Sequence, residues 1–122
     1  MAASHEYRLT AVDDRLEVWQ RGAPDLAGAA RFVAAIETAL ADCGARKLVF
    51  DNRETTATEA AVREHIIAWV RAISERCVVA VVLRSEMLAV RLNMEALAHR
   101  ARTRAFGDQA EALAWLAKHS PG

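Results

Sequence analysis

Two short apolar runs, each followed by a segment with helical periodicity, constrain the fold of this 122-residue chain most strongly. The runs are "RKLVFD" at 46–51 and "CVVAVVLR" at 77–84. Continuous apolar character over so few residues is typical of strands that are buried on both faces, as in parallel sheets. Because parallel neighbours need a long crossover, usually a helix, this alternation predicts an α/β fold with a mostly parallel sheet.

The first 22 residues add an antiparallel hairpin to this sheet. Apolar and polar residues alternate on both sides of the pair Asp13 and Asp14, and Trp19 falls on the face opposite the apolar set. A period of two around an acidic turn predicts a β-hairpin, so we expect a mixed sheet. The apolar set is Tyr7, Leu9, Ala11, Leu16 and Val18.

Four segments carry apolar residues at helical spacing, and a short strand, "TRAF" at 103–106, precedes the last of them. Gly44 is expected to end the first helix, and Thr56 with Glu59 has the Thr-x-x-Glu form of a capping box for the second. The segments are 26–44, 56–76, 85–101 and 108–119, with Asp25, Ser85 and Asp108 as further expected N-terminal caps.

The third helical segment is expected to face the core with the stripe Met87, Val90, Met94, Leu97 and Ala101. Other apolar residues fall off the main stripes of their helices, and Trp19 lies apart on the hairpin. Either a second buried face or a self-association surface accounts for them, which leaves a homodimer open. The helical residues concerned are Phe32, Ile67, Leu88 and Leu92.

Composition excludes several classes of function. The chain has 16 basic and 16 acidic residues, so no net field attracts nucleic acid, which we do not expect as a partner. Cys43 and Cys77 have no ligand spacing, so we predict a reduced, cytoplasmic protein without a metal site or cofactor. Its start has no signal-peptide pattern, and its apolar runs are shorter than the roughly 20 residues that span a bilayer.

The order of elements and the segment "RTRAFGDQAEALAWL" resemble the SpoIIAA-like members of the STAS superfamily. There, an Arg-x-Phe strand is followed by an acidic turn and a Glu-Ala-x-x-Trp-Leu helix. The resemblance implies one STAS-like domain over 1–122, with about four helices; we expect 1–5 and 119–122 to be flexible. The matching residues are Arg104, Phe106, Asp108, Glu111, Ala112, Trp115 and Leu116.

Two branches of this group bear on function. Anti-sigma-factor antagonists carry a phosphorylatable Ser in the loop after the third strand and are controlled by a partner kinase. Here "NRETTATEAA" stands in that place without Ser or Gly, so the nearest candidate phosphoacceptors are Thr55, Thr56 and Thr58. The other branch is similar to the lipid-binding CRAL-TRIO fold and consists largely of proteins without assigned chemistry.

The ends of the two apolar strands supply the candidate site. Ligands of open α/β sheets bind beyond the carboxyl ends of the strands, where helix N-termini and Arg side chains favour anions. The alternative is that these polar residues only cap helices and pair with one another in solvent. The candidate ligand- or partner-binding residues are Asp51, Asn52, Arg53, Arg84 and Ser85.

No catalytic constellation is visible in the sequence. The four His residues lack the spacing of a metal site, and no nucleophile elbow is present. We therefore expect a non-enzymatic regulatory or binding module that acts through protein contact or a small ligand at the strand ends. The alternatives are a small-molecule or lipid carrier with an apolar pocket between helices and, ranked last, an enzyme that uses Asp51 and Arg53.

Overall fold

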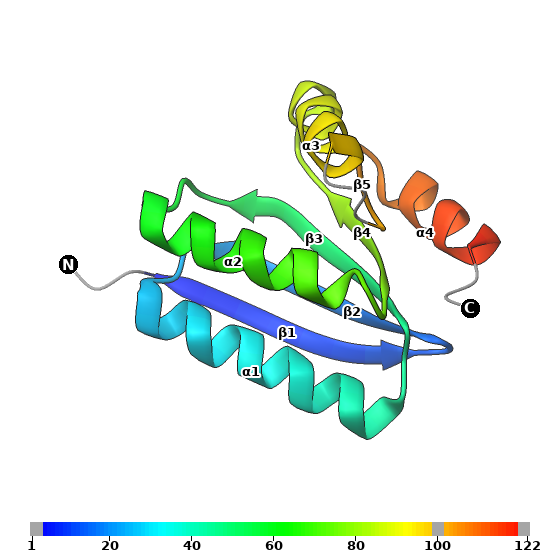
Figure 1. Cartoon of the computed structure of the whole chain (residues 1–122), viewed down its shortest axis with the longest axis horizontal. Coiled ribbons are helices and arrows are strands. Elements are labelled where there is room, and N and C mark those ends of the chain that lie inside the picture. The colour runs from blue at the N-terminus through cyan, green and yellow to red at the C-terminus, as the bar shows by residue number, and fades with distance from the viewer. Residues whose placement is uncertain (1–3, 99–101, 120–122) are drawn as a thin grey trace.

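The computed structural model describes residues 4–98 and 102–119, with the backbone alone for 95–98. Five strands form one mixed sheet in the order β1-β2-β3-β4-β5 (Figure 1). β1 and β2 are antiparallel and the remaining pairs are parallel, which confirms the predicted mixed sheet with its N-terminal hairpin. The strands are His5–Val12, Arg15–Gly22, Lys47–Thr55, Val78–Val82 and Thr103–Phe106; α1 to α4 are Leu26–Cys43, Ala60–Ile73, Glu86–Ala98 and Gln109–Lys118.

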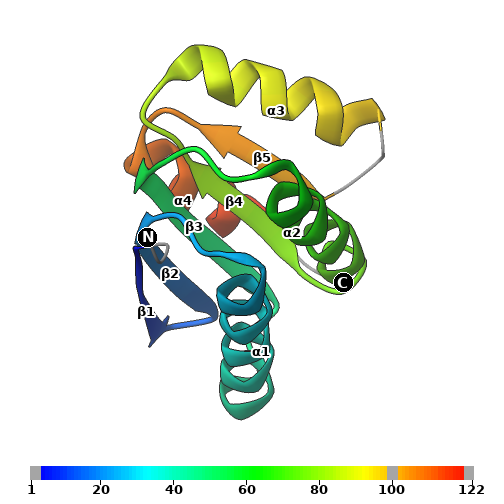
Figure 2. The ribbon, with the colours of Figure 1, turned by 90° about the vertical axis from the view of Figure 1, so that its left-hand side faces the viewer.

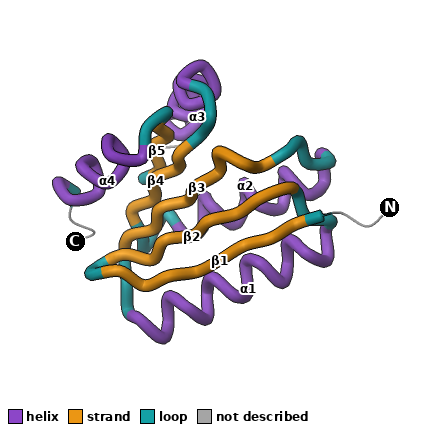
Figure 3. Tube along the Cα trace, turned by 180° about the vertical axis from the view of Figure 1, so that it is seen from behind, coloured by secondary structure: helices purple, strands orange, loops and turns teal. Residues whose placement is uncertain are grey.

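The helices are distributed unequally over the two faces of the sheet. α1 and α2 lie side by side on one face, and α3 lies beyond β4 beside β5 (Figure 2). α4 packs on the other face, against β3, β4 and β5. Seen from behind, β1 and β2 have no described helix over them (Figure 3). One face of the hairpin is therefore open to solvent.

The core consists of a layer on each face of the sheet. The larger layer joins the strands to α1, α2 and α3 and is centred on Leu48, Phe50 and Ile36. The smaller one packs Val49 and neighbouring β4 side chains against α4. All five residues of β4 are buried, as expected of a central parallel strand with helices on both sides.

Helix ends follow local sequence signals with one exception. The Asp25 and Asp108 carboxylates accept N–H bonds from the first turns of α1 and α4, and Gly44 ends α1 with φ 69°, so these predictions are confirmed. The predicted Thr56 capping box is wrong, because α2 begins at Ala60. The Thr56 N–H instead donates to Gly22 O at 3.1 Å, which keeps the chain extended past β3.

The predicted core stripe of α3 is also wrong. Met87, Val90 and Met94 are exposed, whereas Ala89 is buried; Leu97 and Ala101 lie outside the residues whose side chains are described. Phe32, for which the sequence left a second buried face or a self-association surface open, is buried in the main core and makes edge contacts with the rings of His5 and Tyr7.

The two chain ends are only partly described. His5, at the end expected to be flexible, belongs to β1, and the His119 ring bonds to Trp115 O at 2.7 Å. Residues 1–3 and 120–122 lie outside the described part of the chain. Within that part, no helix combines the length and apolar character needed to cross a membrane.

Candidate functional site

β3 continues four residues beyond Asp51, where the sequence indicated that it would stop. β2 runs alongside this extension and supplies backbone partners, with Arg21 opposite Glu54 and Gly22 opposite Thr55. β4 ends at Val82, opposite Asp51, so the extension pairs on one side only. The register with β2 shifts between Trp19 and Arg21, which marks a β-bulge, and bulges redirect side chains.

Asp51 and Arg53 form a bidentate ion pair on the face of the extension that α4 covers. The Arg53 guanidinium donates to both Asp51 carboxylate oxygens, at 2.9 and 2.8 Å, and also to Gln109 Oε1 at 3.0 Å. These bonds from Arg53 outweigh partial burial and hold the pKa of Asp51 below its usual value. Arg53 therefore already uses its Nε and Nη2 groups in bonds within the protein.

Asn52 faces the opposite side of the sheet. Its Oδ1 accepts from Gln20 Nε2 at 2.7 Å, and Gln20 Oε1 lies 2.8 Å from His5 Nε2. Gln20 is 8% exposed, so this chain of side-chain amides satisfies a buried polar group between β1, β2 and β3. Asn52 is a structural residue in this setting, and it is separated from Asp51 because β3 continues past Asp51 and adjacent strand residues face opposite sides.

Residues 56–59 form an exposed loop between β3 and α2. Thr56 and Glu59 are exposed, Thr58 is half-buried, and the Thr55 hydroxyl donates to Asn52 O at 2.8 Å. Arg84 Nη1 reaches Thr55 O at 3.3 Å from the end of β4. The loop and the start of α3 therefore lie at the same edge of the sheet.

Ser85 lies at the start of α3. Its hydroxyl is 3.5 Å from Leu88 N, and its carbonyl accepts from Ala89 N at 3.1 Å. The structure thus brings Arg84 and Ser85 to the edge formed by loop 56–59. We call loop 56–59 with Arg53, Arg84 and Ser85 the strand-end surface.

Beside this edge, a hollow of about 260 Å³ lies on the open face of the sheet. Trp19 lies there with its Nε1 donating to Glu54 Oε2 at 2.9 Å, and the Arg8 guanidinium lies 4.5 Å from its ring centre. Such a cation–π contact stabilises a partly exposed ring. The other residues that line the hollow include Thr10, Glu17, Asp51 and Gln109.

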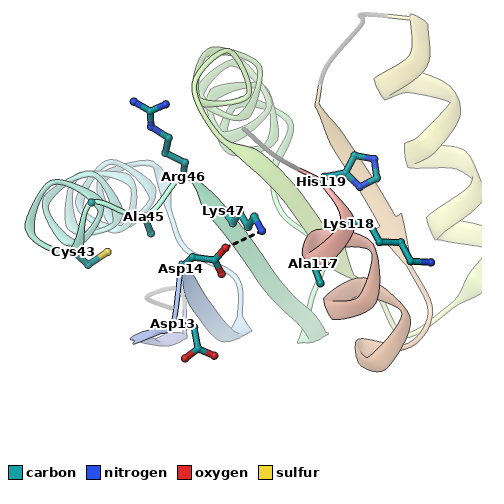
Figure 4. Close-up of a pocket in the computed structure, with 10 residues that line it drawn as sticks. Asp13, Asp14, Cys43, Ala45, Arg46, Lys47, Ala117, Lys118 and His119 are labelled. Carbon is teal, nitrogen blue, oxygen red and sulfur yellow. Dashed lines mark ion pairs between the residues drawn. The ribbon is translucent and has the colours of Figure 1, made fainter. Parts of the chain in front are cut away.

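A larger hollow, of about 420 Å³, lies at the opposite ends of the strands, beside the hairpin turn and the start of β3 (Figure 4). There, Lys47 is 8% exposed and its Nζ pairs with Asp14 Oδ2 at 2.8 Å. The hydrogen bond from Lys47 lowers the pKa of Asp14. Sequence reasoning missed this place because its lining comes from the hairpin turn, the α1–β3 connection and the end of α4, which no short motif links.

Neither hollow supports the apolar pocket of a carrier. Charged side chains line both, among them Arg8, Glu17 and Asp51 in the smaller one and Asp14 and Lys47 in the larger. Among the described residues, no three His, Cys, Asp or Glu side chains are grouped so that they could hold a metal ion.

Comparison with known proteins gives structural neighbours only. No protein-family profile matches the sequence, and no curated protein is similar enough to count as a relative. A DUF3478-family protein with a SpoIIAA-like fold, from Shewanella loihica, is 15% identical with a TM-score of 0.71, over 95% of this chain and 96% of that one. An anti-sigma factor antagonist from Mycobacterium paratuberculosis is 18% identical, also with a TM-score of 0.71, over 97% of this chain and 100% of that one.

One neighbour has a SpoIIAA-like fold and the other is an anti-sigma factor antagonist, which agrees with the resemblance found in the sequence. At these identities the likeness concerns the fold alone. This chain's five-stranded mixed sheet, with its antiparallel hairpin and four described helices, matches a SpoIIAA-like fold. The chain therefore has a SpoIIAA-like α/β fold.

Proposed function

We propose that this protein is a non-enzymatic regulatory module of STAS type that binds a protein partner through the strand-end surface. The proposal is supported by the similarity to an anti-sigma factor antagonist, a class of protein that acts by protein contact. The free cysteines Cys43 and Cys77 fit a reducing compartment, and we place the protein in the cytoplasm.

One observation carries the proposal: loop 56–59 is exposed, yet held at its start by the main sheet. The Thr56 N–H is bonded to the end of β2, and Arg84 reaches the preceding carbonyl of Thr55. Exposed polar side chains on a loop that a rigid scaffold positions are typical of binding surfaces. A partner can dock there with little loss of loop entropy.

The other functions considered from the sequence have less support. An anion ligand at Arg53 would compete with bonds that its guanidinium already makes to both Asp51 carboxylate oxygens and to Gln109 Oε1. An enzyme that uses the Asp51 carboxylate as a nucleophile would first have to break two bonds to Arg53. These contacts favour a surface that binds a protein partner over a site that binds a small molecule.

Regulation of this module by phosphorylation belongs to the same proposal. Thr56 is the phosphoacceptor of first choice because it is exposed, whereas the Thr55 hydroxyl is bonded to a backbone carbonyl and Thr58 is half-buried. A phosphate there would lie shortly before the start of α2, where the helix dipole favours negative charge. Intact-mass spectrometry of protein from its own cells, before and after phosphatase, tests this; Thr56→Ala should remove the modified species.

Site-specific photo-crosslinking tests the binding surface. Replacing Thr56 with a benzophenone amino acid in the native cells should give a discrete adduct with one protein after irradiation. The same amino acid at Ala41, an exposed position of α1, is the control and should give none. An absent adduct at Thr56, or the same adducts from both positions, would refute binding at this surface.

A further inference from the structure

The two lateral edges of the sheet, formed by β5 and β1, differ in whether another part of the chain covers them. Beside β5, Asn93 Nδ2 donates to Ala105 O at 3.0 Å, and Asn93 Oδ1 accepts from Ala105 N at 2.6 Å. The side-chain amide of α3 thus takes the place of a neighbouring strand. At the other edge, β1 pairs with β2 alone among the described strands (Figure 3). An eight-residue strand therefore has one unpaired side.

The backbone groups on the unpaired side of β1 belong to alternate residues. The Ala23 N–H donates to Ser4 O at 3.0 Å, so these two residues form a hydrogen-bonded pair of the hairpin. Hydrogen-bonded and non-hydrogen-bonded pairs alternate in antiparallel strands, and β1 pairs with β2 without a bulge. The N–H and C=O groups of Tyr7 and Leu9 therefore point away from β2. Natural edge strands often carry Lys, Pro or a bulge that prevents further pairing, and β1 has none of these.

The helix beside this edge does not close over it. α1 packs on the face of the sheet that carries Tyr7, and a hollow of about 250 Å³ lies between its first turns and that ring. Tyr7 remains 37% exposed although it contacts the ring of Phe32. Gly28, which has no side chain, lines the hollow on the helix side. A second strand can thus approach β1 from solvent.

Two charges on the open face of β1 are not fully used within the chain. Glu6 Oε1 accepts from Arg21 Nη2 at 2.6 Å, and no described group donates to Glu6 Oε2. The Arg8 guanidinium lies 4.5 Å from the centre of the Trp19 ring and forms no ion pair with a described residue. Stacking uses the flat face of a guanidinium and leaves the N–H groups at its rim as donors. An acceptor and a set of donors therefore lie two residues apart on one face.

These charges select one arrangement for a second copy. When two β1 strands pair antiparallel about a two-fold axis at Tyr7, Glu6 of each copy lies opposite Arg8 of the other. These are non-hydrogen-bonded pairs, in which opposite side chains are closest. A shift of the register by two residues in either direction would place Arg8 opposite Arg8 or Glu6 opposite Glu6. We infer that β1 pairs with β1 of a second copy about this axis, which joins the two sheets into one.

Charge reversal at the two positions is the first test. The wild-type protein should be a dimer in sedimentation equilibrium at about 100 μM. Glu6→Arg and Arg8→Glu should each dimerise at least about tenfold more weakly, because each places like charges opposite one another. An equal mixture of the two variants should form a heterodimer, since every opposed pair is then of opposite charge. Arg63→Glu, at an exposed position of α2, is the matched control and should dimerise as the wild type does.

Cysteine crosslinking tests the register without a change of charge. In a Cys43→Ser background, Tyr7→Cys should form an intermolecular disulfide under mild oxidation, because residues on the axis have Cα atoms about 5.5 Å apart. Ala11→Cys should form none, since a position four residues from the axis is separated from its copy by more than about 25 Å.

The inference uses neither loop 56–59 nor Arg84, so it and the proposed strand-end surface can fail independently. It is overturned by a wild-type protein that stays monomeric at about 100 μM, by charge variants that dimerise as the wild type does, or by a mixture without heterodimer. Crosslinking through position 11 instead of position 7 would also refute this register. A monomer whose β1 binds an extended segment of a different protein would assign the edge to that protein and overturn the inference.

Discussion

Polar side chains near the strand ends differ in whether their hydrogen-bonding groups are already used. Gln20 is 8% exposed and shares its amide between His5 and Asn52, so this set stabilises the sheet. Thr56 and Arg84 are exposed at the same edge. The sequence grouped Asn52 with Asp51, Arg53 and Arg84 because the strand was expected to end at Asp51; since β3 continues to Thr55, successive side chains alternate between the two faces of the sheet.

The Asp51–Arg53 pair should make folding stability depend on pH. Arg53 lowers the pKa of Asp51 in the folded state below its unfolded value of about 3.9. The carboxylate then stabilises the fold above that value, and this stabilisation is lost as pH falls through the folded pKa.

We therefore expect Asp51→Asn to lower the free energy of unfolding at neutral pH and to cost less at about pH 3. Urea unfolding at both values measures the difference, with Asp42→Asn at an exposed position of α1 as the control. An equal cost at both pH values would contradict the role of this charge.

The hydroxyl group of Thr103 suggests a substitution that should stabilise the protein. Thr103 Oγ1 is buried, and within residues 4–98 and 102–119 it has no hydrogen-bond partner. Burying an unpaired polar atom costs about 1–3 kcal/mol, so Thr103→Val should stabilise the protein by about 1 kcal/mol. Thermal unfolding compares it with Thr10→Val on the open face, which should change stability by less than about 0.5 kcal/mol. A lower melting temperature for Thr103→Val would mean that the hydroxyl is satisfied.

At the scale of elements, type and order are easier to predict from sequence than rotation about a helix axis. The buried strands and the caps Asp25 and Asp108 follow from short-range patterns, and the structure confirms them. The third helix has apolar residues on two faces, so periodicity alone could not choose between them. The choice depends on Asn93, whose bonds to β5 are invisible to a search for apolar periodicity.

This account predicts the effect of removing the Asn93 amide. Asn93→Ala deletes two hydrogen bonds to Ala105 and should lower the free energy of unfolding by about 1–3 kcal/mol. Asn93→Asp keeps an acceptor for Ala105 N and loses the donor to Ala105 O, so it should fall between wild type and Asn93→Ala. Amide hydrogen exchange at Ala105 should be faster in Asn93→Ala than in Asn93→Asp, which still accepts from this N–H. Unchanged exchange in Asn93→Ala would show that this contact does not hold α3 in place.

For the whole molecule, the alternation of strands and helices was sufficient to predict the mixed sheet, because parallel strands require crossover helices. The distribution of helices over the two faces was not predictable, since periodicity does not say which face a helix covers. The open face around Trp19 and the hollow around Lys47 follow from that distribution. Each combines residues from distant parts of the chain, so sequence spacing gave no signal.

The central claim is that the strand-end surface binds a protein partner without contributing much to stability. The ion pair of Arg53 with Asp51 contributes at most about 1 kcal/mol, so Arg53→Ala combined with Arg84→Ala should leave the protein folded and lower its melting temperature by at most about 5 °C. Arg46→Ala, an exposed arginine at the opposite ends of the strands, is the matched control.

The most direct test is the affinity of these variants for the protein that crosslinks to position 56, measured by titration calorimetry. We predict that Arg53→Ala/Arg84→Ala binds at least about tenfold more weakly than wild type, whereas Arg46→Ala binds equally well. Equal affinity of all three proteins for this partner would contradict the assignment of the strand-end surface as the binding site.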